Sequence, residues 1–243
     1  MPCAGAVLSK HRSQKGFAVT KRIIVLLMCV AVALPMLADN KIAKRLSEST
    51  AVLQTVLDKQ EIPKNVMNKA VCVLIYPSVK KVGIGIGVSY GRGVLVCRSG
   101  PNMNGPWSAP AMYTLDTGSL GAQLGSNATD YVALVMTKRG ANKVLSGKLK
   151  LGADAQATAG PSNAAASGWN DTNIDILTYS QSKGLFAGAS LGSASMGSDD
   201  SANKDLYGKD VNASQIIQDG VVKVTPDGQA LVNLLTKYSP KYM

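Results

Sequence analysis

Histidine is almost absent from this sequence of 243 residues, which contains one, His11. That residue lies in an N-terminal segment with the pattern of a removable signal. Imidazole supplies most acid–base catalysis near neutral pH and is a common zinc ligand. Catalysis by a Ser-His-Asp or Cys-His arrangement and a histidine-ligated metal site are therefore excluded for the mature chain.

Aromatic residues are also scarce, at 5% of the chain, whereas hydrophobic residues make up 46% and glycine occupies 24 positions. The apolar content is sufficient for one sizeable core. With so few rings available, that core must be packed mainly from aliphatic and small side chains.

The first 38 residues predict a secretion signal. A basic stretch precedes the apolar run of residues 23–34, and Met36, Leu37 and Ala38 form a plausible cleavage site before Asp39. The apolar run is short for a membrane span, so a retained anchor is the less favoured alternative. We expect an exported, periplasmic or envelope-associated protein of bacterial type.

Removal of this segment changes the charge of the chain. The segment holds 5 of the 26 Lys and Arg residues and none of the 15 acids, so residues 39–243 keep 21 against 15, a net charge of +6. The formal +11 of the whole sequence is thus partly targeting information. The remainder favours anionic surfaces weakly and does not identify them.

Two cysteines remain after cleavage, Cys72 and Cys97. In an oxidising compartment a disulfide between them would stabilise the fold by about 3 kcal/mol in the chain-entropy model. Two buried thiols on neighbouring strands are the open alternative, because sequence does not give the distance between the two Cα atoms.

Residues 79–95 contain the most regular pattern of the chain. Gly83, Gly85 and Gly87 alternate with aliphatic residues at the period of a β-strand. The spacing fits no register of the dinucleotide motif G-x-G-x-x-G. We therefore interpret these as structural glycines, in a strand whose bare face another backbone or a helix packs against.

Helical and strand patterns divide the rest of the mature chain. Residues 39–69 carry an apolar stripe that predicts a long and a short helix, and residues 225–238 predict a final helix. Residues 70–192 contain about six to eight strand candidates, and residues 193–212 predict a polar surface loop. We expect one α+β domain over residues 39–243: a strongly curled or barrel-like antiparallel β-sheet of small-residue-faced strands, covered by the N-terminal helices and the C-terminal helix.

Several polar and aromatic residues carry weaker signals. Asp116, Asp130 and Asp154 lack the short spacing of a metal or acid–base site, so we expect them to cap turns or accept backbone hydrogen bonds. Trp107 is expected to anchor its loop. The basic cluster over residues 138–150 predicts a solvated hairpin around Gly140.

Four blocks of the sequence resemble one family. Residues 76–95, 107–136, 145–161 and 176–191 (YPSVKKVGIGIGVSYGRGVL, WSAPAMYTLDTGSLGAQLGSNATDYVALVM, LSGKLKLGADAQATAGP and ILTYSQSKGLFAGASL) are similar, in that order, to the conserved blocks of the SYLF domain. The resemblance spans roughly residues 40–215. It implies a non-enzymatic lipid-binding module, found elsewhere beside SH3 and FYVE domains, that binds phospholipid membranes with a basic, amphipathic N-terminal helix.

The resemblance also implies which residues contact lipid. The helix expected from residue 39 to 59 would supply cations and apolar residues for insertion, and the start of the glycine strand would add a basic pair. The cations are Lys41, Lys44, Arg45, Lys59, Lys80 and Lys81, and the apolar residues are Ile42, Leu46 and Leu53. A core-facing helix and a solvated strand edge are the alternatives.

The sequence thus predicts a protein without enzymatic activity, cofactor or metal. The secretion signal, with no SH3 or FYVE companion in the chain, favours anionic phospholipids of a bacterial envelope over phosphoinositides. Nucleic acid is not an expected partner. The alternative is a structural or interaction protein of the envelope that binds a protein or glycan.

Overall fold

Strands from the whole length of the described chain pair into one nine-stranded sheet, with the path β5-β9-β3-β2-β1-β4-β7-β6 and β8 paired to β7. The computed structural model describes residues 41–82, 88–117, 128–161, 174–182, 185–188 and 194–242. The strands are β1 (Cys72–Val82), β2 (Val88–Cys97), β3 (Ala111–Thr117), β4 (Thr129–Val135), β5 (Lys148–Lys150), β6 (Ala157–Ala159), β7 (Ile176–Ser182), β8 (Leu185–Gly188) and β9 (Ala194–Ser198).

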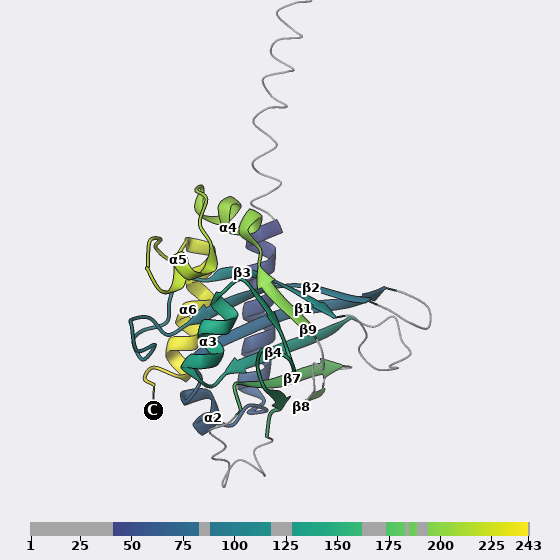
Figure 1. Ribbon diagram of the computed structural model, residues 1–243. Coiled ribbons are helices and arrows are strands. Elements are labelled where there is room, and N and C mark those ends of the chain that lie inside the picture. Colours follow the sequence, from purple (N-terminus) through teal and green to yellow (C-terminus); the bar gives the residue numbers. More distant parts are fainter. Residues whose placement is uncertain are drawn as a thin grey trace, which may run out of the picture. The chain divides into compact units, whose positions relative to one another are not determined.

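The expected α+β fold with a curled sheet is confirmed, with one difference in strand direction (Figure 1). The pairs are antiparallel except that β6 runs parallel to β7. β6 is a short strand of 3 residues, because residues 152–154 shortly before it form a turn. The sheet is therefore mixed and not purely antiparallel.

β1 lies in the middle of the sheet, and its residues 72–77 are buried on both faces, as the continuous apolar run there indicates. Leu74 belongs to one apolar cluster, whereas Val73 and Ile75 belong to the other. Successive side chains of a strand point to opposite faces. The sheet thus separates two hydrophobic cores, each closed by its own set of helices.

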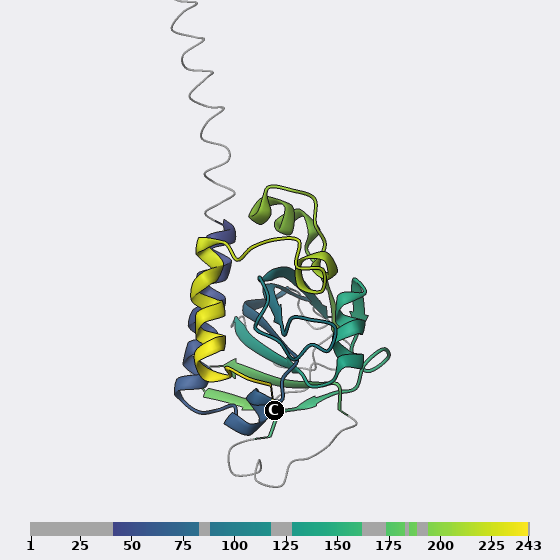
Figure 2. The ribbon, with the colours of Figure 1, turned by 90° about the vertical axis from the view of Figure 1, so that its left-hand side faces the viewer.

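One face is covered by three helices: a helix over residues 41–58, called the N-terminal helix below, α2 (Lys64–Asn68) and α6 (Pro226–Tyr238). Figure 2 shows the N-terminal helix (purple) and α6 (yellow) side by side. Gln54 near the end of the N-terminal helix donates to the Tyr238 hydroxyl at the end of α6, and residues from the starts of both helices line one shallow pocket. The two helices therefore run in the same direction. Thr225 caps α6 by accepting from the Gly228 amide, as its Thr-Pro start predicts.

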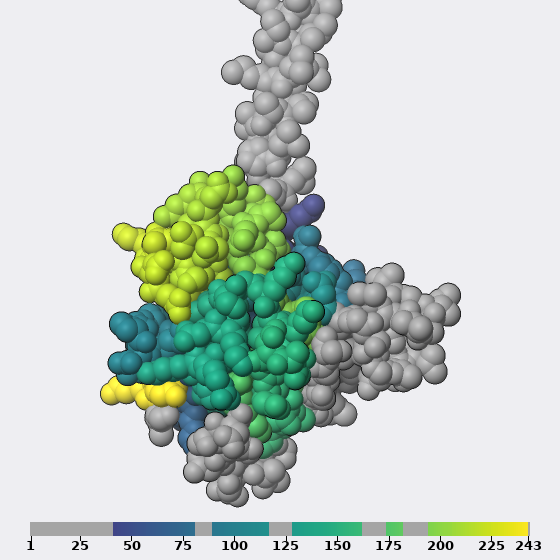
Figure 3. All heavy atoms as spheres, in the orientation of Figure 1, coloured from purple at the N-terminus to yellow at the C-terminus, as the bar shows by residue number. Residues whose placement is uncertain are grey.

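The other face is covered by α3 (Lys138–Leu145) and α5 (Ala213–Ile217), while α4 (Asp200–Tyr207) lies beside β3. In Figure 3 these helices, teal to yellow-green, form much of the surface turned to the viewer. The hairpin predicted around Gly140 is wrong: that segment is α3. Thr137 caps it, and Gly140 packs 3.1 Å, measured from an ideal Cβ, from Asp175 and Val135.

The single strand predicted over residues 79–95 is also wrong. The chain reverses between β1 and β2, which pair antiparallel from Cys72↔Cys97 to Val82↔Val88. Gly83, Gly85 and Gly87 lie outside the described residues. The expected close approach is nevertheless found at the neighbouring Gly93, where a Cβ would lie 2.1 Å from the Ile75 carbonyl oxygen.

The polar loop predicted over residues 193–212 contains β9 and α4 instead. β9 is a strand because Ala194, Met196 and Gly197 are buried against β3 and β5. Small and polar residues hide this pattern in the sequence. Asp199 then caps α4 by accepting from the Ala202 amide.

Candidate functional site

Three of the predicted lipid-binding cations lie on the exposed side of the N-terminal helix or just beyond it: Lys41, Lys44 and Lys59. Lys44 lies 3.7 Å from Glu48 one turn further on, and such a surface pair contributes only about 0.3–0.5 kcal/mol. Lys41 and Lys44 are therefore exposed to an external anionic surface.

Arg45 differs, and its predicted place on the lipid-binding surface is wrong. It is 7% exposed, and its Nη1 lies 2.9 Å from Oδ2 of Asp199. Burial alone would raise the pKa of Asp199, but the hydrogen bond and charge of Arg45, with further hydrogen bonds, hold that pKa below its ordinary value. Arg45 thus joins the N-terminal helix to the start of α4.

The apolar stripe of the N-terminal helix is likewise not free for insertion. Ile42 is 5% exposed, and Leu46 and Leu53 are fully buried in the core of that face. The helix is amphipathic because it covers the sheet, which was the alternative interpretation of the same pattern. Insertion of this stripe into a bilayer would first require the helix to leave the sheet.

A second group of cations surrounds an exposed aromatic ring on β1 and β2. Lys80 of β1 lies opposite Tyr90 of β2 in the register of the two strands. Nε of Arg92 donates to the Tyr90 hydroxyl at 2.7 Å. Tyr90 is 40% exposed, and the guanidinium carbon of Arg92 lies 5.7 Å from the centre of its ring. We call Lys80, Tyr90 and Arg92 the strand patch.

Asp199 acts electrostatically on both Arg45 of the N-terminal helix and Arg92 of the strand patch. The hydrogen bond to Tyr90 raises the pKa of Arg92, and the charge of Asp199, the partner of Arg45, raises it further. Asp116, opposite Tyr90 on β3, is an exposed acid at the border of the patch. The three patch residues and this neighbour keep a net positive charge.

Sequence reasoning found Lys80 as a candidate but missed Tyr90. Lys81 is on β1, but its side chain lies outside the described part of the chain. Tyr90 stands between Ser89 and Gly91, and an aromatic residue beside small neighbours in a strand is the signal that could have identified it.

Two of the three aspartates, Asp130 and Asp154, accept backbone hydrogen bonds, as expected. Oδ1 of Asp130 accepts from the Ser78 amide at 2.8 Å, and Oδ2 of Asp154 accepts from the Lys150 amide at 2.7 Å. Within the described ranges no group of three or more His, Cys, Asp or Glu residues is arranged to hold a metal ion.

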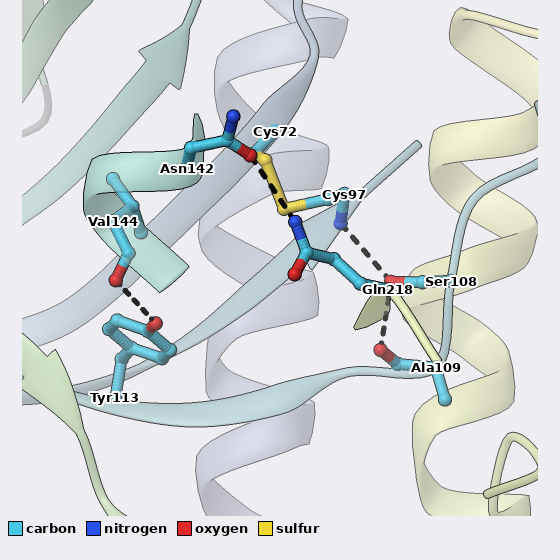
Figure 4. Close-up of a disulfide and its surroundings, with 8 residues drawn as sticks. All are labelled: Cys72, Cys97, Ser108, Ala109, Tyr113, Asn142, Val144 and Gln218. Carbon is cyan, nitrogen blue, oxygen red and sulfur yellow. Dashed lines mark hydrogen bonds between the residues drawn. A yellow bond between two sulfur atoms is a disulfide. The ribbon is translucent and has the colours of Figure 1, made fainter. Parts of the chain in front are cut away.

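A disulfide joins Cys72 of β1 to Cys97 of β2, with the Cα atoms 3.9 Å apart (Figure 4). Both cysteines are fully buried, on the face covered by α3 and α5. The amide of Cys97 donates to the Ser108 hydroxyl, which donates to the Ala109 carbonyl at 3.0 Å. The disulfide joins two cysteines that are 25 positions apart in the sequence, at the centre of the sheet.

Arg98, directly after the disulfide, is a buried cation that sequence reasoning missed. Its Nη2 donates to the Ser239 carbonyl at 2.8 Å, and its guanidinium carbon lies 4.0 Å from the centre of the Trp107 ring. Burial lowers the pKa of Arg98 to about 10. Trp107 donates to the same carbonyl, so the expected anchor role of Trp107 is confirmed, at the end of α6.

Known proteins match this chain over most of its described length. The family model described as "Ysc84: Las17-binding protein actin regulator" matches residues 116–238. Protein YSC84 of Saccharomyces cerevisiae is 32% identical over 201 residues, and SH3 domain-containing YSC84-like protein 1 of Mus musculus is 27% identical over 206 residues. LAS seventeen-binding protein 3 of Saccharomyces cerevisiae is 29% identical over 208 residues.

The matches cover 81% of this chain and 42% of YSC84, and 84% of this chain and 44% of LAS seventeen-binding protein 3. For the mouse protein the shares are 84% and 59%. The chain therefore spans less than two thirds of the length of these curated relatives. No solved structure matches it significantly.

Among the described helices, none is both long and apolar enough to cross a membrane. The order of the matching blocks, the curled sheet between its helices and the family match agree with one another. The chain belongs to the Ysc84 family, the family of the SYLF domain.

Proposed function

We propose that this protein is a non-enzymatic module that associates with anionic phospholipid membranes through the strand patch, assisted by Lys41 and Lys44. The observation that supports this most is the exposed Tyr90 with Lys80 and Arg92 around it. Tyrosine suits the boundary of a bilayer because its ring is apolar and its hydroxyl is polar. Each nearby cation adds about 1 kcal/mol at an anionic surface.

The N-terminal helix contributes through its charged side only. Its apolar stripe is buried and Arg45 is bound to Asp199, whereas Lys41 and Lys44 are exposed. Asp199 is paired with Arg45, and its charge also acts on Arg92, so the start of the helix and the strand patch share one acidic neighbour. The proposed surface is thus electrostatic and interfacial, and requires no unfolding.

Sedimentation with vesicles tests this function. We expect the purified protein to bind phosphatidylglycerol vesicles, to bind phosphatidylcholine vesicles much more weakly, and to dissociate as salt concentration rises. Lys80→Gln combined with Arg92→Gln removes two cations and should weaken binding by about 2 kcal/mol, roughly thirtyfold. Lys223→Gln, an exposed lysine before α6, is the control. Equal binding to both vesicle types would contradict the proposal.

A protein partner is the second candidate function. The family description and one relative, LAS seventeen-binding protein 3, carry names that refer to Las17 binding, so binding of a protein is a property named for relatives of this chain. A purified partner that forms a stoichiometric complex without lipid, while the protein ignores anionic vesicles, would favour this candidate over the first.

We further propose that the protein is exported and works in an oxidising compartment. The signal pattern of residues 1–38 and the buried Cys72–Cys97 disulfide support this, because disulfides persist mainly outside the cytosol. Thiol alkylation of the protein in intact cells tests it. Both cysteines should resist alkylation until the unfolded protein is reduced, and free thiols in the mature chain would contradict the proposal.

A further inference from the structure

A cavity of about 520 Å³ lies on the opposite end of the N-terminal helix from Lys41, where that helix, α2 and the end of α6 meet. Its apolar lining comes from Leu57, Ile62 and Met67, each at most 5% exposed. This volume falls within the range of about 300–1,000 Å³ that is usual for small-molecule sites. None of the strand-patch residues lines it.

Two exposed lysines belong to the cavity wall, Lys64 and Lys237. In the part of the chain that the structure describes, neither forms a salt bridge. Nζ of Lys237 lies 5.2 Å from the centre of the Tyr238 ring. The wall therefore offers two cations without an ionic partner above an apolar lining.

Asp58, the carboxylate of the same wall, already has its own donors. It accepts from the Tyr238 hydroxyl and from Nε2 of Gln54, the latter at 2.6 Å. The hydrogen bond from Tyr238 is the largest cause of its lowered pKa, and the charge of Lys237 contributes least. The wall thus contains two lysines and one ionised carboxylate, so its net charge is positive.

Gln60, also in the cavity wall, has φ 54, a left-handed value that is unfavourable for residues other than glycine. It sits where the N-terminal helix ends, with the Glu61 amide donating to the Val56 carbonyl at 3.1 Å. A left-handed residue directly after the last turn is a common way for a helix to end, so Gln60 marks the C-terminal cap of this helix.

We propose that this cavity binds a soluble single-chain amphiphile: an alkyl chain with one phosphate or carboxylate head. The apolar lining would take the start of the chain, and Lys64 and Lys237 would bind the head. The site is separate from the strand patch and does not depend on membrane association. A bilayer lipid is not its ligand in this proposal, because vesicle contact is assigned to other residues.

Titration calorimetry with hexyl phosphate tests the inference on the full mature protein. We expect saturable one-to-one binding, at least tenfold tighter than binding of either inorganic phosphate or hexanol. Lys64→Gln combined with Lys237→Gln should weaken hexyl phosphate binding at least tenfold. Lys223→Gln, with an exposed lysine outside the cavity, should leave it unchanged.

Vesicle sedimentation of the double variant separates this inference from the proposed function. Because both substitutions are at the protein surface, circular dichroism should show an unchanged fold, and binding to phosphatidylglycerol vesicles should also be unchanged. Hexyl phosphate affinity equal to that of either half-molecule, or unaffected by the double substitution, would overturn the site. Loss of vesicle binding in the same double variant would contradict the proposal that the cavity and the membrane-binding surface are independent.

Discussion

The N-terminal helix and the β1–β2 ladder both combine cations with apolar or aromatic residues, but the fold uses the two regions in opposite ways. In the helix, Leu46 is fully buried and Arg45 is paired with Asp199. In the ladder, Tyr90 is 40% exposed and Arg92 lies against its ring at the surface. The amphipathic pattern of the helix serves the core, whereas the strand patch faces outward.

This contrast shows that a basic amphipathic helix is not by itself a membrane-binding element. A buried apolar stripe contributes to the stability of the fold, and moving it into a bilayer would expose the sheet that it covers. The strand patch has no such cost, because its ring and cations are already at the surface. We therefore propose that, in the folded protein, lipid contact is made chiefly by the strands.

The largest expected effect is at Gly93, where the β1–β2 ladder allows no side chain. In Gly93→Ala the added Cβ would lie 2.1 Å from the Ile75 carbonyl oxygen and 2.5 Å from Cδ1 of Tyr76. We expect a loss of about 3 kcal/mol or more in the free energy of unfolding, measured by urea denaturation. Gly91→Ala is the graded control, since its nearest neighbour is the end of the Val79 side chain. Equal midpoints for both variants would refute the close backbone approach.

The next largest effect distinguishes two neighbouring cations of the N-terminal helix. Arg45→Met leaves the carboxylate of Asp199 without its partner and should cost about 3 kcal/mol of stability. Lys44→Met, on the exposed side, should change stability by less than about 0.5 kcal/mol. Adding Asp199→Asn to Arg45→Met should restore part of the loss. If both single variants were equally stable, Arg45 would not be the link between this helix and α4.

The same ion pair gives a smaller, pH-dependent effect. The pKa of Asp199 is below its ordinary value of 3.8 in the folded protein. A lowered carboxylate pKa contributes stability that is present above the unfolded-state pKa and is lost as the pH falls through the folded-state value. The stability difference between the wild type and Arg45→Met should therefore shrink below about pH 4. Thermal midpoints across this range measure it, and a difference independent of pH would contradict the assignment.

The smallest effect concerns the two exposed helix lysines. Lys41→Gln combined with Lys44→Gln should weaken binding to phosphatidylglycerol vesicles by less than the strand-patch pair Lys80→Gln with Arg92→Gln, because Tyr90 adds an interfacial contact only to the strand patch. Co-sedimentation at a single salt concentration compares the two. A larger loss from the helix pair would reverse the assignment of the main contact.

Much of the fold follows from local patterns in the sequence. The helix stripes and the continuous apolar run of β1 carry strong periodicity, and the Thr-Pro start of α6 is a specific capping signal. The errors fall where the pattern is ambiguous. The alternation over residues 79–95 is the same whether the chain continues straight or turns back, and β9 is built from small residues that resemble a loop.

The candidate site was harder to predict, because exposure depends on tertiary packing. Lys44 and Arg45 are adjacent and chemically similar in the sequence, yet one is exposed and the other is held by an aspartate 154 positions away. No local pattern announces a partner at that separation. The role of Tyr90 likewise depends on Lys80, which becomes its neighbour only when β1 and β2 pair.

Amide hydrogen exchange in the presence and absence of phosphatidylglycerol vesicles tests the central claim most directly. If the strand patch contacts lipid, peptides containing Lys80, Tyr90 and Arg92 should gain protection on the vesicles. The buried amides of residues 41–58 should keep the protection that they have in solution. Loss or rearrangement of protection in the N-terminal helix, with no change around Tyr90, would show that the helix leaves the sheet to bind lipid. That result would contradict lipid contact through the strand patch.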